Sequence, residues 1–270
     1  MGEKEKSEFF KRFPLCRIVP LKEINSHSDY YLKEFLEKMC SANNVEIKSC
    51  LKRVYTEGMG LFGIFNQIAL IVSRINEDIG RINRNEELFR IATIGGQLTE
   101  DETHELDKST NNVELFCLDT ASVLIFVNIF MDKLAKFLGQ LIKAEKVRTK
   151  NFSCFMDSLR ELKIGKIREL VQLIDEHTKW FVDFKDARDD FVVHHPGAGR
   201  AIELLDGKAF VVLTTAKGGT KEAKHVLMNS EAKGISIDDI SDSLERLRSL
   251  LKNLNEFLCE NLGSLPIKAE

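Results

Sequence analysis

The sequence has no excess of positive charge, and this absence bounds its function. Its 39 Lys and Arg stand against 42 Asp and Glu, which gives a formal net charge of −3 at pH 7. The sequence pI is about 6.1. Bulk electrostatics therefore do not indicate a nucleic-acid-binding protein. Any anion site must be a local cluster, alone or completed by a second subunit.

The sequence also lacks the cysteine patterns of metal centres and disulfide frameworks. The 6 cysteines contain no C-x2-C pair and form no Cys/His cluster at metal-ligand spacing. Most fall at apolar helical positions, where a free thiol behaves as a small core residue. We expect no metal, and scattered free thiols are typical of a reducing cytoplasm. The residues are Cys16, Cys40, Cys50, Cys117, Cys154 and Cys259.

Long hydrophobic runs and phosphate-binding loops are missing as well. The longest apolar run, Ala121 to Met131, contains Asn128 and is shorter than the roughly 20 residues that a membrane helix needs. The N-terminus has no apolar signal segment. The stretch from Lys217 to Lys221 lacks the spacing of a phosphate loop, so we expect a flexible link and no cofactor. The expectation is a soluble cytoplasmic chain without membrane association.

Apolar residues recur at intervals of three and four over most of the chain, which predicts helices. After an N-terminal arm (residues 1–27), residues 28–270 are expected to form a single domain. A short helix is predicted at 45–55 and a long one at 58–94. The polar stretch 95–110 is predicted as a loop, with His104 solvated.

The second half of the chain continues this helical pattern with one change of period. Asn111-Asn112 is predicted to cap a central helix that ends near Leu141. From Ile167 a further helix is predicted to lead without a break through Trp180, and Ser236-Ile237-Asp238-Asp239 predicts the start of the last one. Between them, Ala201 to Thr214 reads as a β-hairpin that turns at Asp206-Gly207. The predicted fold is all-α: a helical bundle of five or six helices with a small β-hairpin, about 200–215, before the last helix.

The most informative stretch, Trp180 to Gly197, holds the single Trp, one Arg and an adjacent His pair. At about 100° per residue, Arg188 and His195 lie within roughly 20° of one another on a helix, whereas His194 points about 120° away. A tightened last turn would reverse that order. A His at the carbonyl end of a helix holds its proton more readily, and an Arg beside it suits phosphate chemistry.

A simpler reading of the same stretch remains open. Arg188 can pair with Asp183 or Asp189 at the surface, while the two histidines cap the helix. Other titratable residues are expected to be structural: Glu169 and Glu176 on a solvated face, and His177 as a hydrogen-bonded core histidine.

The run Arg188-Asp189-Asp190-Phe191-Val192-Val193-His194-His195, on a helix that follows two long antiparallel helices, resembles the motif of the HEPN superfamily. The hallmark there is an Arg, a polar residue after it, and a His four to six residues beyond the Arg. The resemblance implies a metal-independent endoribonuclease of the toxin or antiviral-effector type. The resemblance also implies that the products of RNA cleavage carry a 2′,3′-cyclic phosphate.

The resemblance also implies residue roles and partners. Arg188 would hold the phosphate, His194 or His195 would move the proton, and Asp189 would orient one of them. Two protomers would place their motifs together, so a homodimer acting on single-stranded RNA is implied. The alternative within the same family is a non-catalytic helical module that binds a partner protein or a nucleotide.

Overall fold

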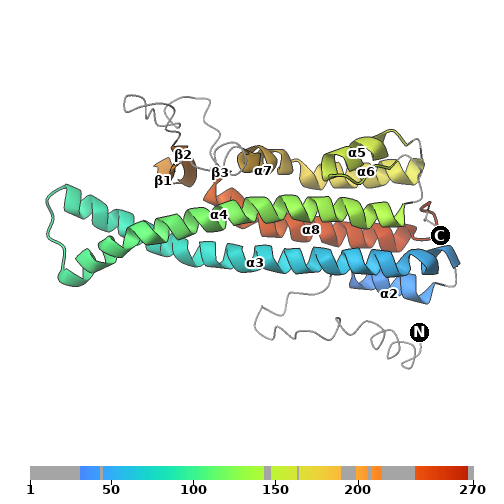
Figure 1. Cartoon of the computed structure of the whole chain (residues 1–270), viewed down its shortest axis with the longest axis horizontal. Coiled ribbons are helices and arrows are strands. Elements are labelled where there is room, and N and C mark those ends of the chain that lie inside the picture. The colour runs from blue at the N-terminus through green and yellow to red at the C-terminus, as the bar shows by residue number, and fades with distance from the viewer. Residues whose placement is uncertain are drawn as a thin grey trace, which may run out of the picture. The chain divides into compact units, whose positions relative to one another are not determined.

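The computed structural model describes residues 31–42, 45–142, 147–162, 164–189, 199–205, 208–214 and 235–266. The described chain is mostly helical, which confirms the all-α prediction. The helices are α2 (Lys33–Ser41), α3 (Val45–Thr93), α4 (Glu100–Leu141), α5 (Phe152–Arg160), α6 (Gly165–Thr178), α7 (Phe181–Arg188) and α8 (Ile237–Asn261). The strands are β1 (Gly199–Leu205), β2 (Lys208–Thr214) and β3 (Ile235–Ser236) (Figure 1).

The chain divides into two compact units, each built from separate segments. Unit 1 comprises residues 1–62, 132–177 and 248–270, and unit 2 comprises 63–131 and 178–247. The helices α3, α4 and α8 each contribute one end to either unit. The prediction of a single domain over 28–270 stays a prediction.

α3 is one helix of 49 residues, so the predicted break between residues 55 and 58 is wrong. The buried stripe runs on across the glycines in unbroken steps of three and four. It contains Ile47, Cys50, Val54, Gly58, Leu61, Phe65, Ile68, Val72 and Ile75. A glycine costs a helix only about 1 kcal/mol, and the continuous packing of this stripe outweighs that cost.

α3 ends in a glycine turn. Gly95 has a φ of 80°, its N–H donates to Ala92 O at 3.2 Å, and Gly96 N–H donates to Ile91 O at 2.9 Å. These are the two bonds of a Schellman motif. A Cβ on Gly96 would lie 2.6 Å from Ile91 Cγ2 and 2.9 Å from the Ile91 carbonyl oxygen, so this position requires glycine.

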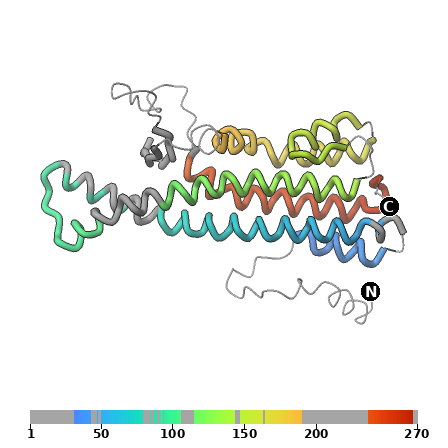
Figure 2. The backbone as a smooth tube through the Cα atoms, viewed as in Figure 1, coloured from blue at the N-terminus to red at the C-terminus, as the bar shows by residue number. Residues whose placement is uncertain are grey.

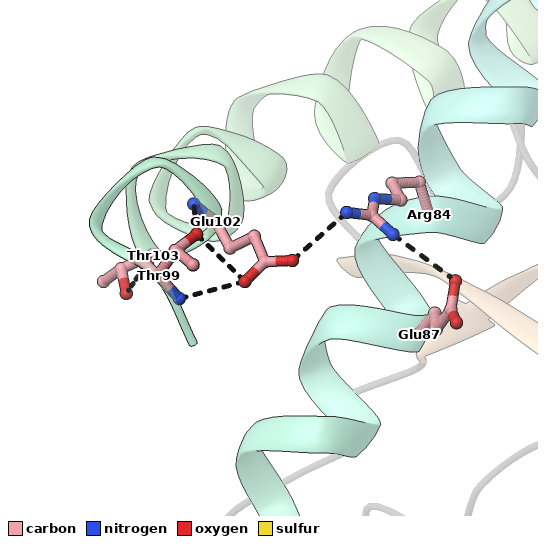
Figure 3. A network of polar contacts seen from close by, with 5 residues as sticks. All are labelled: Arg84, Glu87, Thr99, Glu102 and Thr103. Carbon is pink, nitrogen blue, oxygen red and sulfur yellow. Dashed lines mark hydrogen bonds and ion pairs between the residues drawn. The ribbon is translucent and has the colours of Figure 1, made fainter. Parts of the chain in front are cut away.

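α4 begins at Glu100, and the predicted loop from 95 to 110 with a cap at Asn111 is therefore wrong. Thr99 Oγ1 accepts the N–H of Glu102 at 3.2 Å, and Glu102 Oε2 accepts the N–H of Thr99 at 2.9 Å. This reciprocal pair is a capping box. Figure 3 shows that Glu102 also accepts a hydrogen bond from Arg84 of α3, which itself pairs with Glu87. His104 is exposed as predicted, although on a helix.

These contacts set the charge state of Glu102. The backbone N–H and the hydroxyl of Thr99, followed by Arg84, lower the pKa of this carboxyl below its ordinary value. The ionised form is the one that caps α4, and a carboxylate in the first turn also suits the positive end of the helix dipole.

Unit 1 has a core of aromatic rings. Phe35 of α2 and Phe137 of α4 meet edge to face, with ring centroids 6.2 Å apart, and both rings are fully buried. Gly58 of α3 lies against Phe137 and Leu36, in keeping with α2 beside the first part of α3 in Figure 1. Asn255 of α8 accepts the N–H of Phe35 at 3.1 Å, which satisfies a first-turn donor of α2 that has no partner within its own helix.

Unit 2 is organised on the other ends of α3 and α4, which Figure 2 traces alongside one another. Phe65 and Phe130 pack with ring centroids 6.4 Å apart. At the surface Arg74 donates to both carboxylate oxygens of Asp119, from Nε at 3.0 Å and from Nη2 at 2.6 Å. Ser241 of α8 donates to Asn76 Oδ1 at 2.7 Å, which holds the start of α8 against α3.

The three strands of unit 2 form one antiparallel sheet in the order β1-β2-β3. β1 pairs with β2 from Gly199 opposite Thr214 to Leu205 opposite Lys208. β3 pairs with β2 through Ile235, opposite Val211. β1 and β2 fall in the segment predicted as a hairpin, and its predicted turn, 206–207, lies outside the described residues. β3 was not predicted, since two residues carry no readable alternation.

Candidate functional site around Arg188

The helix that carries Arg188 is shorter at its start than predicted. α6 ends at Thr178, and α7 begins at Phe181 after a turn at Lys179 and Trp180. The prediction of one unbroken helix from Ile167 is therefore wrong at this point. Neither glycine nor proline marks the turn, so the local sequence carries no signal for it.

α7 buries one face and exposes the other. Phe181, Phe184 and Ala187 are buried, three residues apart, while Val182 and Asp183 are exposed. Their spacing of three residues gives α7 one apolar face. The burial of this apolar face sets which side chains of α7 point to solvent.

Arg188 stands at the last position of α7 and is held by its neighbour. Its Nε donates to Asp189 Oδ1 at 2.8 Å, and its Nη2 donates to the same oxygen. Both side chains are about one-third exposed, 28% for Arg188 and 31% for Asp189. Asp189 follows the last residue of the helix, where its negative charge is repelled by the negative end of the helix dipole. The guanidinium of Arg188 offsets this repulsion. Of the two pairings open to Arg188 in the sequence, the structure contains the one with Asp189.

The other two site residues named from the sequence, His194 and His195, lie outside the described residues, as do 190–198 as a whole. The structure therefore places Arg188 and Asp189 together. The pairing of Arg188 with either histidine stays a prediction.

A second cluster of unit 2 was not found from the sequence. The guanidinium carbon of Arg246 lies 5.7 Å from the centre of the Trp180 ring, and its Nη2 donates to Asp239 Oδ1 at 3.0 Å. Trp180 in turn meets Phe184 edge to face at 5.0 Å. The cluster ties the start of α7 to the first turns of α8, and the cation–π contact adds to that link. Trp180 and Arg246 are too far apart in sequence for any motif to join them.

The start of α8 agrees with the sequence. Ser236 Oγ accepts the N–H of Asp239 at 3.0 Å and donates to Asp239 Oδ2 at 2.6 Å. This confirms the cap predicted at Ser236. Because Asp239 also accepts a hydrogen bond from Arg246, this arginine links the cap of α8 to the Trp180 ring.

Three further titratable residues singled out in the sequence have structural partners in the described part of the chain. His177 Nδ1 lies 2.9 Å from Leu173 O, as expected of a satisfied histidine. Glu169 pairs with Lys166, and Glu176 accepts from Gln172, both at the surface. Within the described part of the chain, no three His, Cys, Asp or Glu residues are arranged to hold a metal ion.

The thiols are poor nucleophiles where their pKa is shifted. Burial, with help from Glu37, raises the pKa of Cys40 to about 11. Burial also raises the pKa of Cys259. Both are protonated at neutral pH, and the thiolate is the reactive form. The five described cysteines form no disulfide with one another, and Cys16 lies outside the described residues.

Two helical segments, Cys50–Asp78 and Leu115–Leu141, are long and apolar enough to cross a membrane by length and composition. More than half of the second segment's apolar window is buried inside the protein, 56% of it. The core helices of water-soluble proteins meet the same criterion. The expectation of no membrane association stays a prediction.

No protein-family model, curated protein or solved structure matches this chain. The HEPN resemblance therefore rests on the motif at Arg188 and on the helical pattern alone.

Proposed function

We propose that this chain is a HEPN-like, metal-independent endoribonuclease of the toxin or antiviral-effector type that acts on single-stranded RNA in the cytoplasm. The observation that supports the proposal is the pair Arg188–Asp189 at the end of α7, in a mostly helical chain, five residues ahead of a His pair. An arginine fixed in this way is preorganised, because the orientation of its guanidinium is set before a substrate arrives.

In the proposed reaction, a ribose 2′-OH attacks the adjacent phosphodiester and leaves a 2′,3′-cyclic phosphate. His194 or His195 takes or gives the proton. A guanidinium has five N–H donors, and Asp189 engages two of those of Arg188. The other donors of Arg188 bind the phosphate, whose negative charge grows in the transition state. Asp189 is then a positioning residue.

The overall negative charge of the chain requires a local solution. We propose a homodimer in which the motifs of two protomers face a common cleft, so that two arginines and up to four histidines converge. Such a cleft would attract RNA although the whole protein carries a net charge of −3.

A second function, a non-catalytic HEPN-like module that binds a partner protein, is favoured by one observation. Asp189 neutralises Arg188, and Asp183 and Asp186 lie on the same short helix. Carboxylates repel phosphate and so disfavour RNA at this end of α7. The two functions differ in whether cleavage is measurable.

The test is incubation of the full chain with a labelled single-stranded RNA in the presence of EDTA. We expect cleavage products with cyclic phosphate ends. Arg188→Ala should lose about 100- to 1000-fold in rate, the typical loss for one transition-state donor. His194→Ala and His195→Ala identify the histidine that acts.

The matched control is Arg160→Ala in unit 1. Arg160 also forms surface ion pairs, with Asp157 and Asp175, but lies on α5. The Arg160→Ala variant should cleave the RNA at the rate of the wild type. Equal rates in the Arg188 variant and the wild type would show that a contaminant cleaves the RNA. No cleavage by the wild type would favour the binding module.

A further inference from the structure

Arg246 of α8 presents a fixed charge to the start of α7. Its guanidinium carbon lies 5.7 Å from the centre of the Trp180 ring. Its Nη2 donates to Asp239 Oδ1 at 3.0 Å and lies 3.8 Å from Asp242 Oδ2. The arginine side chain is 32% exposed. Two carboxylates therefore hold the guanidinium beside the ring, and a cation–π contact gains strength when its cation is partly desolvated.

The start of α7 depends on such tertiary contacts. Trp180 makes no side-chain hydrogen bond to the first turn, and its φ of −66° and ψ of −21° are compatible with a continuous helix. Neither glycine nor proline separates α6 from α7. The direction that α7 takes after the turn is therefore set by what Trp180 contacts, including Arg246 and the ring of Phe184.

The same arginine also reaches the strand beside α7. β3 lies next to α7, as Figure 1 shows. Ser236 of β3 donates to Asp239 Oδ2 at 2.6 Å, and Asp239 is the carboxylate that accepts from Arg246. Arg246 thus connects α7, α8 and β3 within unit 2.

These contacts bear on Arg188, which lies at the other end of α7. A helix of 8 residues is about 12 Å long, and so short a helix moves as one body. Asp189 holds the guanidinium of Arg188 relative to α7, but it does not hold α7 relative to the rest of unit 2. A displacement of about 1 Å at a catalytic group can lower a rate by about 100-fold.

We propose that Arg246 is a positioning residue of the Arg188 site and acts through the Trp180 ring and α7. This role rests on the proposed ribonuclease function. Arg246 does not contact the RNA. It sets the place to which α7 brings the guanidinium of Arg188.

Hydrogen exchange in the full chain without RNA tests whether Arg246 holds α7. Arg246→Met keeps the length of the side chain and removes its charge. The amides of residues 185–189 should then exchange about two- to fivefold faster, which corresponds to the loss of one cation–π contact. Arg246→Lys, which keeps the charge, should exchange like the wild type.

The matched control for exchange is Arg74→Met. It removes another arginine of unit 2, which pairs with Asp119, and it should leave exchange at residues 185–189 unchanged. Equal exchange in Arg246→Met and the wild type would overturn the proposal. Far-UV circular dichroism checks that each variant keeps the helical content of the wild type.

Cleavage of single-stranded RNA tests the link to Arg188. Arg246→Met should lower kcat about tenfold and leave KM unchanged within about twofold, because Arg246 acts on the position of Arg188 and not on RNA binding. Arg246→Lys should restore most of the rate. In an Arg188→Ala background, Arg246→Met should cause no further loss, since its effect requires Arg188. Additive losses, or a change in KM alone, would overturn the positioning role.

Failure of this proposal and failure of the ribonuclease function give different results. If the wild type cleaves RNA and Arg246→Met keeps its full kcat, only the positioning role fails. If the wild type does not cleave RNA, the ribonuclease function fails, and the exchange rates alone decide whether Arg246 holds α7.

Discussion

Unit 1 and unit 2 treat their large apolar side chains differently. In unit 1, Phe35, Phe137 and Phe155 have no exposed surface, and a buried amide contact, Phe35 to Asn255, joins α2 to α8. Among the described residues, seven large hydrophobic side chains are exposed, and six of them belong to unit 2: Leu70, Ile94, Leu115, Leu118, Ile129 and Val182. The seventh, Ile164, belongs to unit 1.

Unit 2 also buries large rings fully, among them Phe116, Phe130 and Phe184, so the two units differ in what stays exposed. Apolar surface buried inside the chain stabilises the fold, whereas apolar surface left exposed in a contiguous patch usually marks a binding face. Unit 2 also holds Arg188, so the candidate site and most of the exposed large apolar side chains lie in the same unit.

The largest expected effect tests the core of unit 1. Phe137→Ala should lower the free energy of unfolding by about 3–5 kcal/mol, since it removes a fully buried ring and leaves a cavity. Urea denaturation followed by circular dichroism measures it. Val182→Ala in unit 2, on a side chain that is 60% exposed, should change stability by less than about 0.5 kcal/mol. Similar losses in the two variants would refute the comparison.

Next in size is the amide contact of unit 1. Asn255→Ala should cost about 1–3 kcal/mol, because the buried N–H of Phe35 loses its acceptor. Hydrogen exchange at the Phe35 amide should become faster. The control is Asn253→Ala on the same helix, where the amide donates to Ser249 O at an exposed site. That variant should leave exchange at Phe35 unchanged.

The glycines of α3 sharpen the comparison from the other direction. A Cβ on Gly58 would lie 3.5 Å from Phe137, an ordinary contact, and one on Gly63 would meet nothing within 4 Å. Gly58→Ala in unit 1 and Gly63→Ala in unit 2 should each stabilise the chain by about 0.5–1 kcal/mol through helix propensity. Thermal melts measure both. A loss at Gly58 would mean that the core of unit 1 is packed too tightly for a methyl group.

The smallest effect concerns the cap of α4 in unit 2. The pKa of Glu102 is lower in the folded chain than in the unfolded chain. The stability that its ionised carboxyl contributes is therefore fully present above the ordinary carboxyl pKa, and it is lost as the pH falls through the lowered pKa of the folded state. A carboxyl ¹³C titration by NMR measures this pKa. In Thr99→Ala it should rise towards its ordinary value. An unchanged pKa would show that Arg84, and not the cap, controls it.

Helical content was readable from the sequence because buried residues repeat with the period of the helix. The errors fall where a local signal and the tertiary packing disagree. The sequence predicted two helices with a break between residues 55 and 58, and the continuous buried stripe of α3 overrides that break. At the start of α4, the polar stretch concealed a capping box, since Thr99 and Glu102 are three residues apart but no apolar run follows them.

The site was readable only in part, for a different physical reason. The contact between Arg188 and Asp189 joins neighbours in the sequence, and it is one of the two pairings of Arg188 that the sequence predicts. The cluster of Trp180, Arg246 and Asp239 joins residues from separate helices, so no spacing rule reaches it. The break between α6 and α7 likewise has no glycine or proline to announce it.

The interleaving of the two units has a consequence for how the protein is made and cut. Unit 1 is built from three separate segments of the chain, and the amide of Phe35 in the first segment donates its hydrogen bond to Asn255 in the last. Its core cannot be completed on the ribosome until α8 has emerged. No single cleavage of the chain releases either unit as one intact fragment, because each unit is built from two or three separate segments of the chain.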